Sequence, residues 1–267
     1  MLNILFIGDI VGKIGRKTAA KIVPKLKKEH KINLVIANAE NSAHGSGVTN
    51  DIIKELYNTG IDYFTAGDHA FKNKKNLDVY EKEKIIRPAN FPSGSPGQGH
   101  AFIEVDNKKI LLINLIGRVF MSMDYDCPFR KLDEILANIN LQAKKLSAII
   151  IDIHAETTSE KVNIGYYADG RASAVLGTHT HIMTADSRIT KKGMAYITDT
   201  GMVGAANESL GIAKEGTLKT FLTQIKEPHV IPEAGQAIFN SVLIKINTKN
   251  RQAVSIKPIT EFINITN

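Results

Sequence analysis

Three apolar runs separated by helical segments constrain the fold of this chain more than any other feature. The runs "LNILFIG", "INLVIANAE" and "IDYFTAG" are nearly continuous in apolar residues, as in strands that are buried on both faces. The segments between them, "GRKTAAKIVPKLKKEH" and "TNDIIKELYNTG", carry apolar residues at helical spacing. A β-α-β-α-β order predicts an α/β layered fold in which neighbouring strands are parallel.

Residues inside and at the ends of these two helices refine the prediction. Pro24 lies within the first helix, so we expect a kink or a broken turn there. The second helix opens on a capping Thr49 or Asn50 and ends at Gly60, which is typical of a helix terminus.

The remainder of the chain continues the pattern without a linker. A Pro- and Gly-rich loop over residues 87–100 leads into a hairpin formed by "AFIEV" and "KILLINLIG", which turns at Asp106-Asn107. We expect an amphipathic helix in "FRKLDEILANINLQAKK" and strands in "LSAIIIDIHAE", "ASAVLGTHTH" and "GMAYITDTG". A second hairpin turns at residues 248–250 near the C-terminus. We therefore predict a single domain over residues 1–267.

The charge balance favours acidic partners. The chain has 267 residues and a formal net charge of +7. Such a charge suits nucleotides, RNA or phosphate esters. The basic residues are scattered, however, so a solvated lysine-rich surface is the alternative. No basic run interleaved with aromatic residues marks a nucleic-acid groove.

Cysteine use and hydropathy indicate a cytoplasmic protein without a membrane segment. Cys127 is the one cysteine, so no intramolecular disulfide can form, as is usual in a reducing compartment. The apolar run at residues 2–7 is short and lacks a basic lead, so it indicates a strand rather than a signal peptide. No apolar stretch approaches the roughly 18 residues that a membrane helix needs.

Acidic side chains follow the first three predicted strands. Asp9, Glu40 and Asp68 each come just after a strand. The carboxyl ends of parallel strands meet at one edge of a sheet, so we expect these carboxylates to lie close together. They would repel one another unless a cation offsets their charge.

Four of the eight histidines also follow predicted strands, namely His69, His154, His179 and His181. In an extended "GTHTH" segment, the first and second of its histidines point to the same face. A set of ligands made of carboxylates and imidazoles, with no thiolate, suits Fe, Mn, Zn, Ni or Co. Six candidate ligands suggest two ions about 3.5–4 Å apart. We expect the other four histidines to be solvated surface residues.

The glycines of "GDIVGKIG" offer a competing hypothesis. Gly8, Gly12 and Gly15 follow the first strand, as glycines do in dinucleotide-binding turns. Their spacing differs from Gly-x-Gly-x-x-Gly, and Asp9 would repel a pyrophosphate. We favour a tight turn that lets Asp9 reach a metal.

Stretches spread over almost the whole chain carry a resemblance to a known family. They resemble the calcineurin-like metallophosphoesterases and, within them, the bacterial 2′,3′-cyclic-nucleotide 2′-phosphodiesterases of the YmdB type. The resemblance implies a layered α/β/β/α sandwich with its metal site at the carboxyl ends of the strands. The stretches are "ILFIGDIVGKIGR", "NAENSAHGSGVT", "IRPANFP", "INLIGR", "HAETTSEK", "DGRASAVLGTHTHIMTADSRI" and "AYITDTGM".

The resemblance also implies a role for each site residue. Glu40 would be a carboxylate that bridges two metals, and Asn41 beside it would contact water or phosphate. One metal would be held by Asp9 and His181, and the implied proton donor to the leaving oxygen is His69. The second metal would be held by Asp68, His154 and His179.

The YmdB-type branch differs from the larger superfamily in lacking the histidine of the Asp-x-His motif, and here Asp9 is followed by Ile10 and Val11. The chain departs from the pattern of the branch itself in two places. The family's Gly-Asn-His is Gly-Asp-His here, with Asp68 as the second residue. Ala70-Phe71 replaces an aromatic-acid pair. Since Asp68 can still ligate through one oxygen, we expect the site to survive. Its added negative charge should strengthen cation binding and weaken the pull on an anionic phosphate.

The implied activity is hydrolysis of 2′,3′-cyclic nucleotides or related phosphodiesters, with cleavage of the 2′ ester and a 3′-phosphate product. The implied cofactors are two transition-metal ions, Fe or Mn foremost, with Zn, Ni or Co as alternatives. We expect base contacts from the loop at residues 87–100, and the resemblance favours a homo-oligomer with a possible RNA link. Two alternatives are a nucleotide-, RNA- or protein-binding regulatory module with little catalysis, and a phosphomonoesterase or nuclease on the same metal core.

Overall fold

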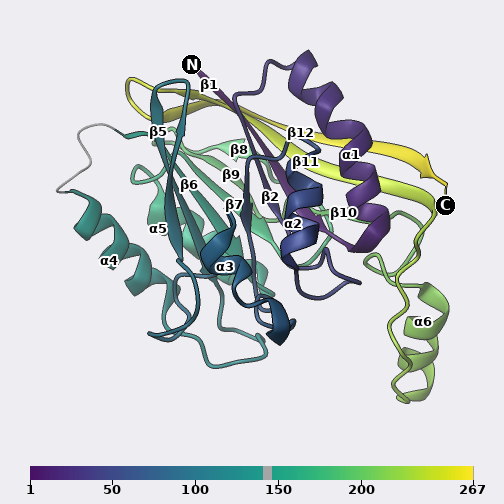
Figure 1. Ribbon diagram of the computed structural model, residues 1–267. Helices are drawn as coiled ribbons and strands as arrows, with labels where there is room; N and C mark the ends of the chain where they lie inside the picture. The colour runs from purple at the N-terminus through teal and green to yellow at the C-terminus, as the bar shows by residue number, and fades with distance from the viewer. Residues whose placement is uncertain (141–145, 267) are drawn as a thin grey trace.

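Two six-stranded sheets face each other between outer layers of helices (Figure 1). The structure, a computed structural model, describes residues 1–140 and 146–266. The first sheet has the order β12-β11-β10-β1-β2-β3, and the second has the order β4-β5-β6-β7-β9-β8. The predicted layered α/β/β/α sandwich is confirmed.

The first sheet is parallel in its centre and antiparallel at one side. Strands β2 and β10 flank β1 in parallel, β3 adds in parallel to β2, and β11 runs antiparallel to both β1 and β10. The long hairpin of β11 and β12 closes that side, as predicted. The strands are β1 (Leu2–Ile10), β2 (Leu34–Asn38), β3 (Tyr63–Thr65), β10 (Met202–Ala205), β11 (Gly235–Asn247) and β12 (Gln252–Ile265).

The second sheet has parallel strands in its centre and an antiparallel pair at each edge. Strands β5, β6, β7 and β9 are parallel, while β4 pairs with β5 and β8 pairs with β9 in the antiparallel sense. Asp106 and Asn107 both have positive φ, which the tight turn of the predicted β4–β5 hairpin requires. The strands are β4 (His100–Val105), β5 (Lys108–Ile116), β6 (Leu146–His154), β7 (Ala174–Thr178), β8 (Arg188–Ile189) and β9 (Ala195–Ile197).

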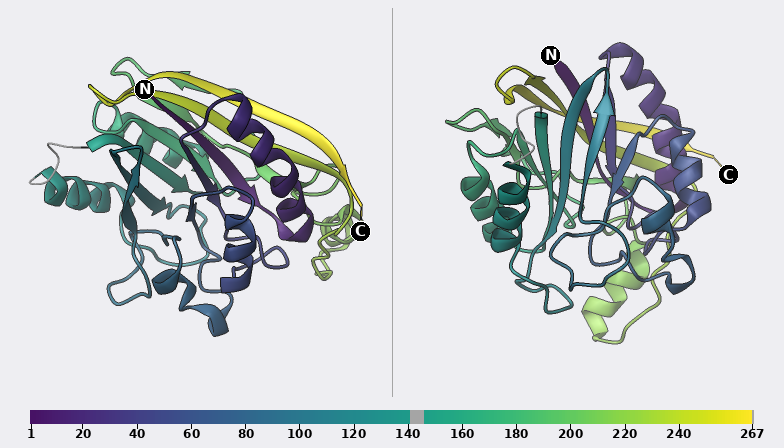
Figure 2. Two further views of the ribbon diagram at one scale, coloured as in Figure 1. Left: turned by 45° about the horizontal axis from the view of Figure 1, so that its top comes forward. Right: turned by 60° about the vertical axis from the view of Figure 1, so that its left-hand side comes forward.

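The helices cover the outer faces of the sheets (Figure 2). Helices α1 and α2 pack on the first sheet, and α4 and α5 pack on the second. Helix α6 stands away from the body, and none of its residues is buried. The helices are α1 (Gly12–Glu29), α2 (Asn50–Tyr57), α3 (Val79–Lys82), α4 (Pro128–Asn140), α5 (Thr158–Ala168) and α6 (Lys214–Thr223), with a 3₁₀ turn η1 (Lys74–Asn76).

Apolar side chains fill the space between the sheets. Phe6 and Ile36 of the first sheet share one buried cluster with Leu112, Ile150 and Leu176 of the second. Separate clusters lie beneath the helices on each outer face. Because the central strands are covered on both faces, their sequences are continuous apolar runs. Because the central strands of each sheet run parallel, their carboxyl ends lie at one edge of that sheet.

Helices α1 and α4 differ in how closely they follow the predictions. Helix α1 passes through Pro24 without a break, so the expected broken turn was wrong. Pro24 faces solvent, whereas Val23 and Leu26 on either side of it are buried against the first sheet and hold the helix in place. The helix predicted from "FRKLDEILANINLQAKK" is confirmed as α4 up to Asn140, and its last five residues lie outside the described part.

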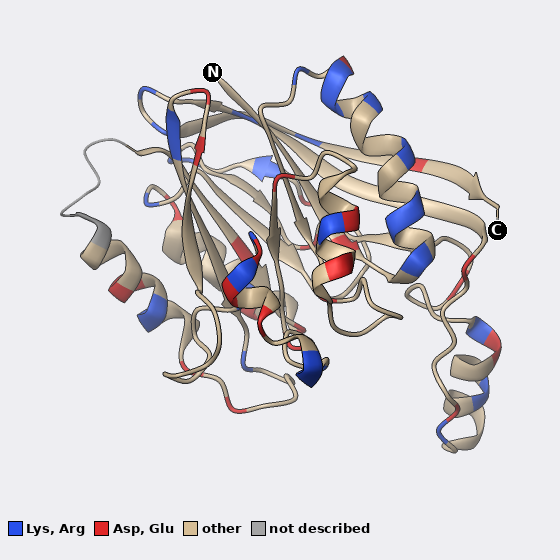
Figure 3. Cartoon of the chain, in the orientation of Figure 1, with Lys and Arg blue, Asp and Glu red and all other residues tan. Residues whose placement is uncertain are grey.

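Charge is distributed over the outer helices rather than along one groove. Lysine and arginine residues are spread along α1 and the other outer elements (Figure 3). No helix in the described part of the chain combines the length and hydropathy that a membrane crossing requires.

Candidate metal centre

The predicted site residues meet where the strands of both sheets end. Every one of them is linked to the others by a continuous series of close contacts. Asp9 belongs to β1 itself rather than following it, because β1 continues to Ile10 beside β10. The others are Glu40 and Asn41 after β2, Asp68 and His69 after β3, His154 at the end of β6, and His179 and His181 after β7.

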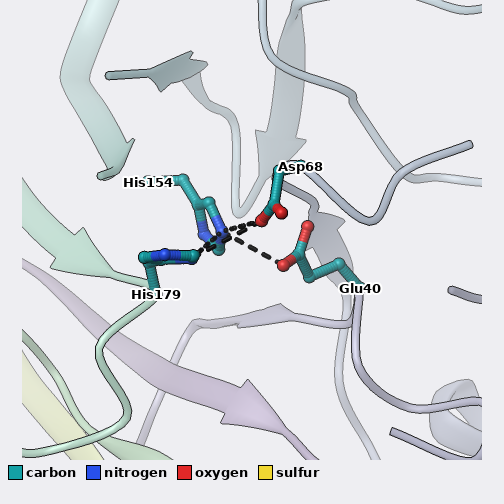
Figure 4. A group of neighbouring side chains, drawn as sticks. All are labelled: Glu40, Asp68, His154 and His179. Atoms are coloured by element: carbon teal, nitrogen blue, oxygen red, sulfur yellow. Dashed lines mark hydrogen bonds and ion pairs between the residues drawn. The ribbon is translucent and has the colours of Figure 1, made fainter. Parts of the chain in front are cut away.

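Glu40, Asp68, His154 and His179 form a compact cluster (Figure 4). One potential ligand atom from each lies within 4.8 Å of all the others. His154 Nε2 is central: it lies 3.0 Å from Glu40 Oε1, 3.2 Å from Asp68 Oδ1 and 3.0 Å from His179 Nδ1. Two carboxylates and two imidazoles within this distance can hold one metal ion.

Outer hydrogen bonds turn the lone pair of His154 toward the cluster. Its Nδ1 lies 3.0 Å from Thr178 Oγ1, and the Thr178 hydroxyl donates to Asp152 at 2.7 Å. The hydroxyl proton is therefore used, so Oγ1 accepts a hydrogen from His154 Nδ1. In the neutral ring, Nε2 then carries the lone pair that faces Glu40 and Asp68, as in a metal-binding histidine.

His179 is oriented in the opposite sense. Its Nε2 lies 3.0 Å from the carboxylate of Glu156, which can only accept a hydrogen bond. The Nδ1 lone pair of the neutral ring therefore faces His154 and Asp68. A carboxylate behind a ligating imidazole fixes its tautomer and increases its basicity.

Asp9, Asn41 and His181 form a second group beside the cluster. Asp9 accepts hydrogen bonds from the backbone N–H of His179 at 3.1 Å and from Asn41 Nδ2 at 3.4 Å. His181 Nε2 lies 3.2 Å from Asn41 Nδ2 and 3.9 Å from Asp9 Oδ1. Since His181 Nδ1 donates to the carbonyl of Leu210 at 3.0 Å, its Nε2 lone pair faces Asp9.

The expected extended conformation of "GTHTH" was wrong. Strand β7 ends at Thr178, and His179 and His181 both have positive φ, at 97° and 66°. The chain bends there, so the two rings reach different parts of the site instead of sharing one face of a strand. The two histidines still belong to one site, because the bend wraps around Asp9.

His69 borders both groups. Its backbone N–H donates to Glu40 Oε2 at 2.9 Å, and its Nδ1 lies 2.7 Å from Asn41 Oδ1. Its Nε2 lies 3.7 Å from Asp68 Oδ2. The imidazole is 30% exposed, so it is the ring of this region that a substrate can reach most easily.

The electrostatics of the cluster fit a cation. Glu40 Oε1 is buried and has no hydrogen-bond partner among the described residues, although His154 Nε2 lies 3.0 Å from it. Burial alone would lower the pKa of His154, but the charge of Glu40 and hydrogen bonding to Asp68 raise it well above its usual value. Burial would likewise raise the pKa of Asp68, but the close approach of the His154 and His179 rings lowers it. A proton on His154 Nε2 and a metal ion would satisfy the same oxygens, so the two compete.

Glycines let the backbones approach at the site. A Cβ at Gly67 would lie 2.2 Å from the His154 ring, which allows no other residue without displacing that ring. A Cβ at Gly8 would lie 1.8 Å from the carbonyl of Gly201, and one at Gly15 would lie 2.4 Å from the carbonyl of Val203. Gly8 and Gly15 thus serve the packing of β1 and α1 against β10, which supports our preference over a dinucleotide-binding turn.

A cavity of about 360 Å³ opens beside the metal cluster. Glu40, Asn41, His69, His179 and His181 are among the residues that line it. It is also lined by Leu210, Ile212, His229 and Ile231, which lie on either side of α6 in the sequence. We expected base contacts from the loop at residues 87–100, but that loop supplies none of the described residues that line this cavity. His229, which we expected to be a plain surface residue, is exposed but lines it.

Sequence reasoning missed the residues that orient the ligands. Glu156 and Asp152 were visible only as polar residues in the strand end "DIHAE", with no sign that they hold His179 and Thr178. Lys161 and Asp199 lie in two of the stretches that carry the family resemblance but were given no role, yet they form a buried ion pair beneath the bend of residues 179–181. Such contacts depend on tertiary packing, which one sequence does not display.

Comparisons with known proteins agree with this architecture. The family model described as "YmdB-like protein" matches residues 5–259. The chain is 44% identical over 259 residues to the 2′,3′-cyclic-nucleotide 2′-phosphodiesterase of Bacillus subtilis (strain 168), covering 97% of this chain and 96% of that protein.

Two crystal structures are similar over nearly the whole chain. A novel phosphatase from Mycoplasma pneumoniae has a TM-score of 0.92 at 32% identity, over 99% of this chain and 94% of that one. A hypothetical protein from Thermus thermophilus has a TM-score of 0.90 at 36% identity, over 98% of this chain and 99% of that one.

The fold and the cluster of carboxylates and imidazoles at its strand ends together define a metallophosphoesterase-type protein with a potential metal-binding site. Within that class, the chain belongs to the YmdB-like protein family, as its sequence resemblance predicted.

Proposed function

We propose that this protein is a dinuclear-metal phosphodiesterase that hydrolyses 2′,3′-cyclic nucleotides, cleaving the 2′ ester to leave a 3′-phosphate. The observation that carries the proposal is the convergence of ligand atoms from Glu40, Asp68, His154 and His179, with the imidazole lone pairs aimed inward. The 44% identity to a named phosphodiesterase supports the reaction class and the substrate.

Two groups of residues would hold two metal ions. Asp68, His154 and His179 would hold one, Asp9 and His181 would hold the other, and Glu40 would bridge them. Glu40 suits that role because Oε1 lacks a hydrogen-bond partner, while Oε2 is fixed by the N–H of His69. We propose Fe or Mn, with Zn, Ni or Co as alternatives, since all accept this donor set. When bound, the ions would polarise the phosphoryl group and make an attacking water acidic at neutral pH.

Side chains of the protein would complete the reaction. Asn41 holds His69 Nδ1 at 2.7 Å and so fixes the ring, leaving Nε2 available to a substrate in the cavity. As the P–O2′ bond breaks, the protonated His69 would give its Nε2 hydrogen to the departing 2′ oxygen, while water supplies the hydroxyl that stays on phosphorus. The Asn41 amide, beside His181, would also contact the phosphate or water.

The nucleoside would extend into the 360 Å³ cavity, where Ile212 and Ile231 offer an apolar wall. This assignment replaces our expectation for residues 87–100. It follows from the position of the cavity directly beside His69 and His179.

One assay separates the proposal from its alternatives. Protein loaded with Mn²⁺, Fe²⁺, Zn²⁺ or Ni²⁺ is given 2′,3′-cyclic AMP, bis-p-nitrophenyl phosphate and p-nitrophenyl phosphate, and the cyclic AMP product is identified by chromatography. We expect 3′-AMP and diester turnover. Preferential monoester turnover would favour the phosphomonoesterase, and absence of turnover with every metal would favour the regulatory binding module.

The wider biological predictions are also proposals. We propose a cytoplasmic homo-oligomer of one-domain subunits, with RNA-derived cyclic phosphates as one source of substrate. Helix α6 and its continuation support association, because Leu218, Phe221, Leu222 and Ile225 are between 57% and 85% exposed. Apolar side chains gathered in this way usually mark a contact surface. Light scattering of Phe221→Glu beside the wild type tests this, with a shift toward the monomer expected.

A further inference from the structure

Two charged residues at the start of α5 are buried although neither has a place in the proposed reaction. Glu160 is 7% exposed and Lys161 is 1% exposed. Both belong to the "HAETTSEK" stretch, six and seven residues after His154. Buried charges are costly unless they are paired and hydrogen-bonded, so each requires a partner of its own.

Lys161 is paired with Asp199 beneath the bend that carries His179 and His181. Its Nζ lies 2.6 Å from Asp199 Oδ2, and both side chains are fully enclosed. The same oxygen accepts hydrogen bonds from the backbone N–H of Thr180 at 3.1 Å and from its hydroxyl at 2.7 Å. Asp199 Oδ1 accepts from the N–H of Gly201 at 2.8 Å. The Asp199 carboxylate therefore holds Thr180, the residue between the two histidines, by two hydrogen bonds.

The bend needs such an anchor. His179 and His181 both adopt positive φ, a conformation that residues other than glycine seldom adopt without support from their surroundings. Thr180 is held at two points by one carboxylate, which fixes the backbone from which both imidazoles extend. Without the lysine, Asp199 would be a buried anion with no cation beside it, and its position would be less well defined.

We propose that Lys161 is a positioning residue: through Asp199 it holds the bend at residues 179–181 so that the rings of His179 and His181 point to their two groups of ligands. The consequence for metal binding rests on the proposed function, whereas the control of the bend does not. Removal of partners that orient metal ligands typically costs 10–100-fold in metal affinity.

Glu160 is a matched control one residue away. Its Oε2 accepts hydrogen bonds from the N–H groups of Arg118 and Val119 at 2.9 and 3.2 Å, so it anchors the loop after β5 instead. It is similarly buried and lies in the same helical turn, but its side chain accepts hydrogen bonds from that other loop. Loss of Glu160 should lower stability without loosening the bend.

The test compares Lys161→Met, Asp199→Asn and Glu160→Gln with the wild type. Hydrogen exchange of the metal-free proteins reports the bend directly, and competition with a chelator gives the affinity for Mn²⁺ alone. We expect faster exchange at residues 179–181 and 10–100-fold weaker Mn²⁺ binding in Lys161→Met. Asp199→Asn, the second variant should Lys161→Met not fold, should show the same two changes. Glu160→Gln should differ from the wild type in neither, although it unfolds at a lower temperature.

Three outcomes would overturn the proposal: unchanged exchange at the bend in Lys161→Met, unchanged exchange in Asp199→Asn, or an equal effect in Glu160→Gln. If the wild type binds no Mn²⁺ or other tested metal, the proposed function fails, but the exchange measurement still decides whether Lys161 holds the bend. Failure of the two ideas can thus be told apart.

Discussion

Replacing Asp68 by Asn is the perturbation that bears most directly on the metal cluster. Asp68 Oδ1 lies 3.2 Å from His154 Nε2 and 3.5 Å from His179 Nδ1, and its Oδ2 lies 3.7 Å from His69 Nε2. Burial would raise the pKa of this carboxyl, but the neighbouring rings of the first two histidines outweigh it and keep the pKa low, so the group is ionised at neutral pH. Asn keeps one oxygen as a potential ligand but removes the charge.

The expected size of the effect follows from charge and distance. Two unit charges 4 Å apart interact by about 4 kcal/mol at an effective dielectric constant of about 20. Much of this is offset because the carboxylate is desolvated, so we expect Asp68→Asn to weaken Mn²⁺ binding about 10–100-fold, or about 1.4–2.8 kcal/mol. With less negative charge beside an anionic phosphate, diester turnover at saturating Mn²⁺ should stay equal or rise.

Chelator competition and diesterase assays at several Mn²⁺ concentrations measure the two quantities separately. Asp62→Asn is the control, because Asp62 also accepts hydrogen bonds, from Lys27 and the N–H of Val35, but lies at the opposite end of the strands. Asp62→Asn should leave Mn²⁺ affinity unchanged. Equal or tighter Mn²⁺ binding by Asp68→Asn, or a tenfold loss of saturated turnover, would refute this reasoning.

Four further changes test other parts of the site. His69→Ala should lower turnover by roughly 10²–10⁴-fold while metal content by elemental analysis stays intact; normal turnover would remove its role as acid. His179→Ala should lower metal content itself in the same analysis. Gly67→Ala should do so too, because its Cβ would lie 2.2 Å from the His154 ring; full occupancy would contradict that steric argument. Asp152→Asn should change how stability depends on pH. Burial raises the pKa of Asp152 to about 7 despite hydrogen bonds from Thr65 and Thr178. The folded chain therefore keeps a proton that the unfolded chain loses above pH 3.8, and wild-type stability should fall relative to the variant as pH rises to about 7. Urea unfolding in chelator across that range measures this, and a constant difference would contradict it.

The alternation of strands and helices was readable from the sequence because the strands are buried on both faces. Continuous apolar runs gave β1, β2, β5 and β6 clearly, and the hairpin of β11 and β12 followed from its two long runs and a polar turn. Short strands were harder to predict from the sequence. Strand β10, at Met202–Ala205, lies between β1 and β11, and its place depends on pairing with β1, which is nearly 200 residues away in the sequence.

The position of each ligand along the chain could be predicted, whereas its orientation could not. A polar residue at the end of a buried strand lies at the carboxyl edge of the sheet. The sequence therefore predicted that Asp9, Glu40 and His154 lie at this edge. The bend at His179 and His181 was missed because an alternating sequence suggests an extended strand, whereas both residues have positive φ and Thr180 between them is hydrogen-bonded to the distant Asp199.

The outer contacts also decide what chemistry each imidazole can perform. Thr178 and Glu156 bind the nitrogens of His154 and His179 that point away from the cluster, so the inward nitrogens are those free to coordinate. His69 differs from these two histidines because its free nitrogen serves the substrate rather than a metal. Asn41 fixes Nδ1, and Nε2 is left to give a proton to a substrate in the cavity that His69 lines. Three histidines with the same side chain therefore differ in role because of the groups behind them.

It follows that Glu156→Gln should weaken metal binding and leave the acid step intact, whereas Asn41→Ala should impair the acid step more than metal binding. Comparing Mn²⁺ affinity with turnover at saturating Mn²⁺ distinguishes the two, and an identical pattern in both variants would show that the outer contacts do not assign the roles.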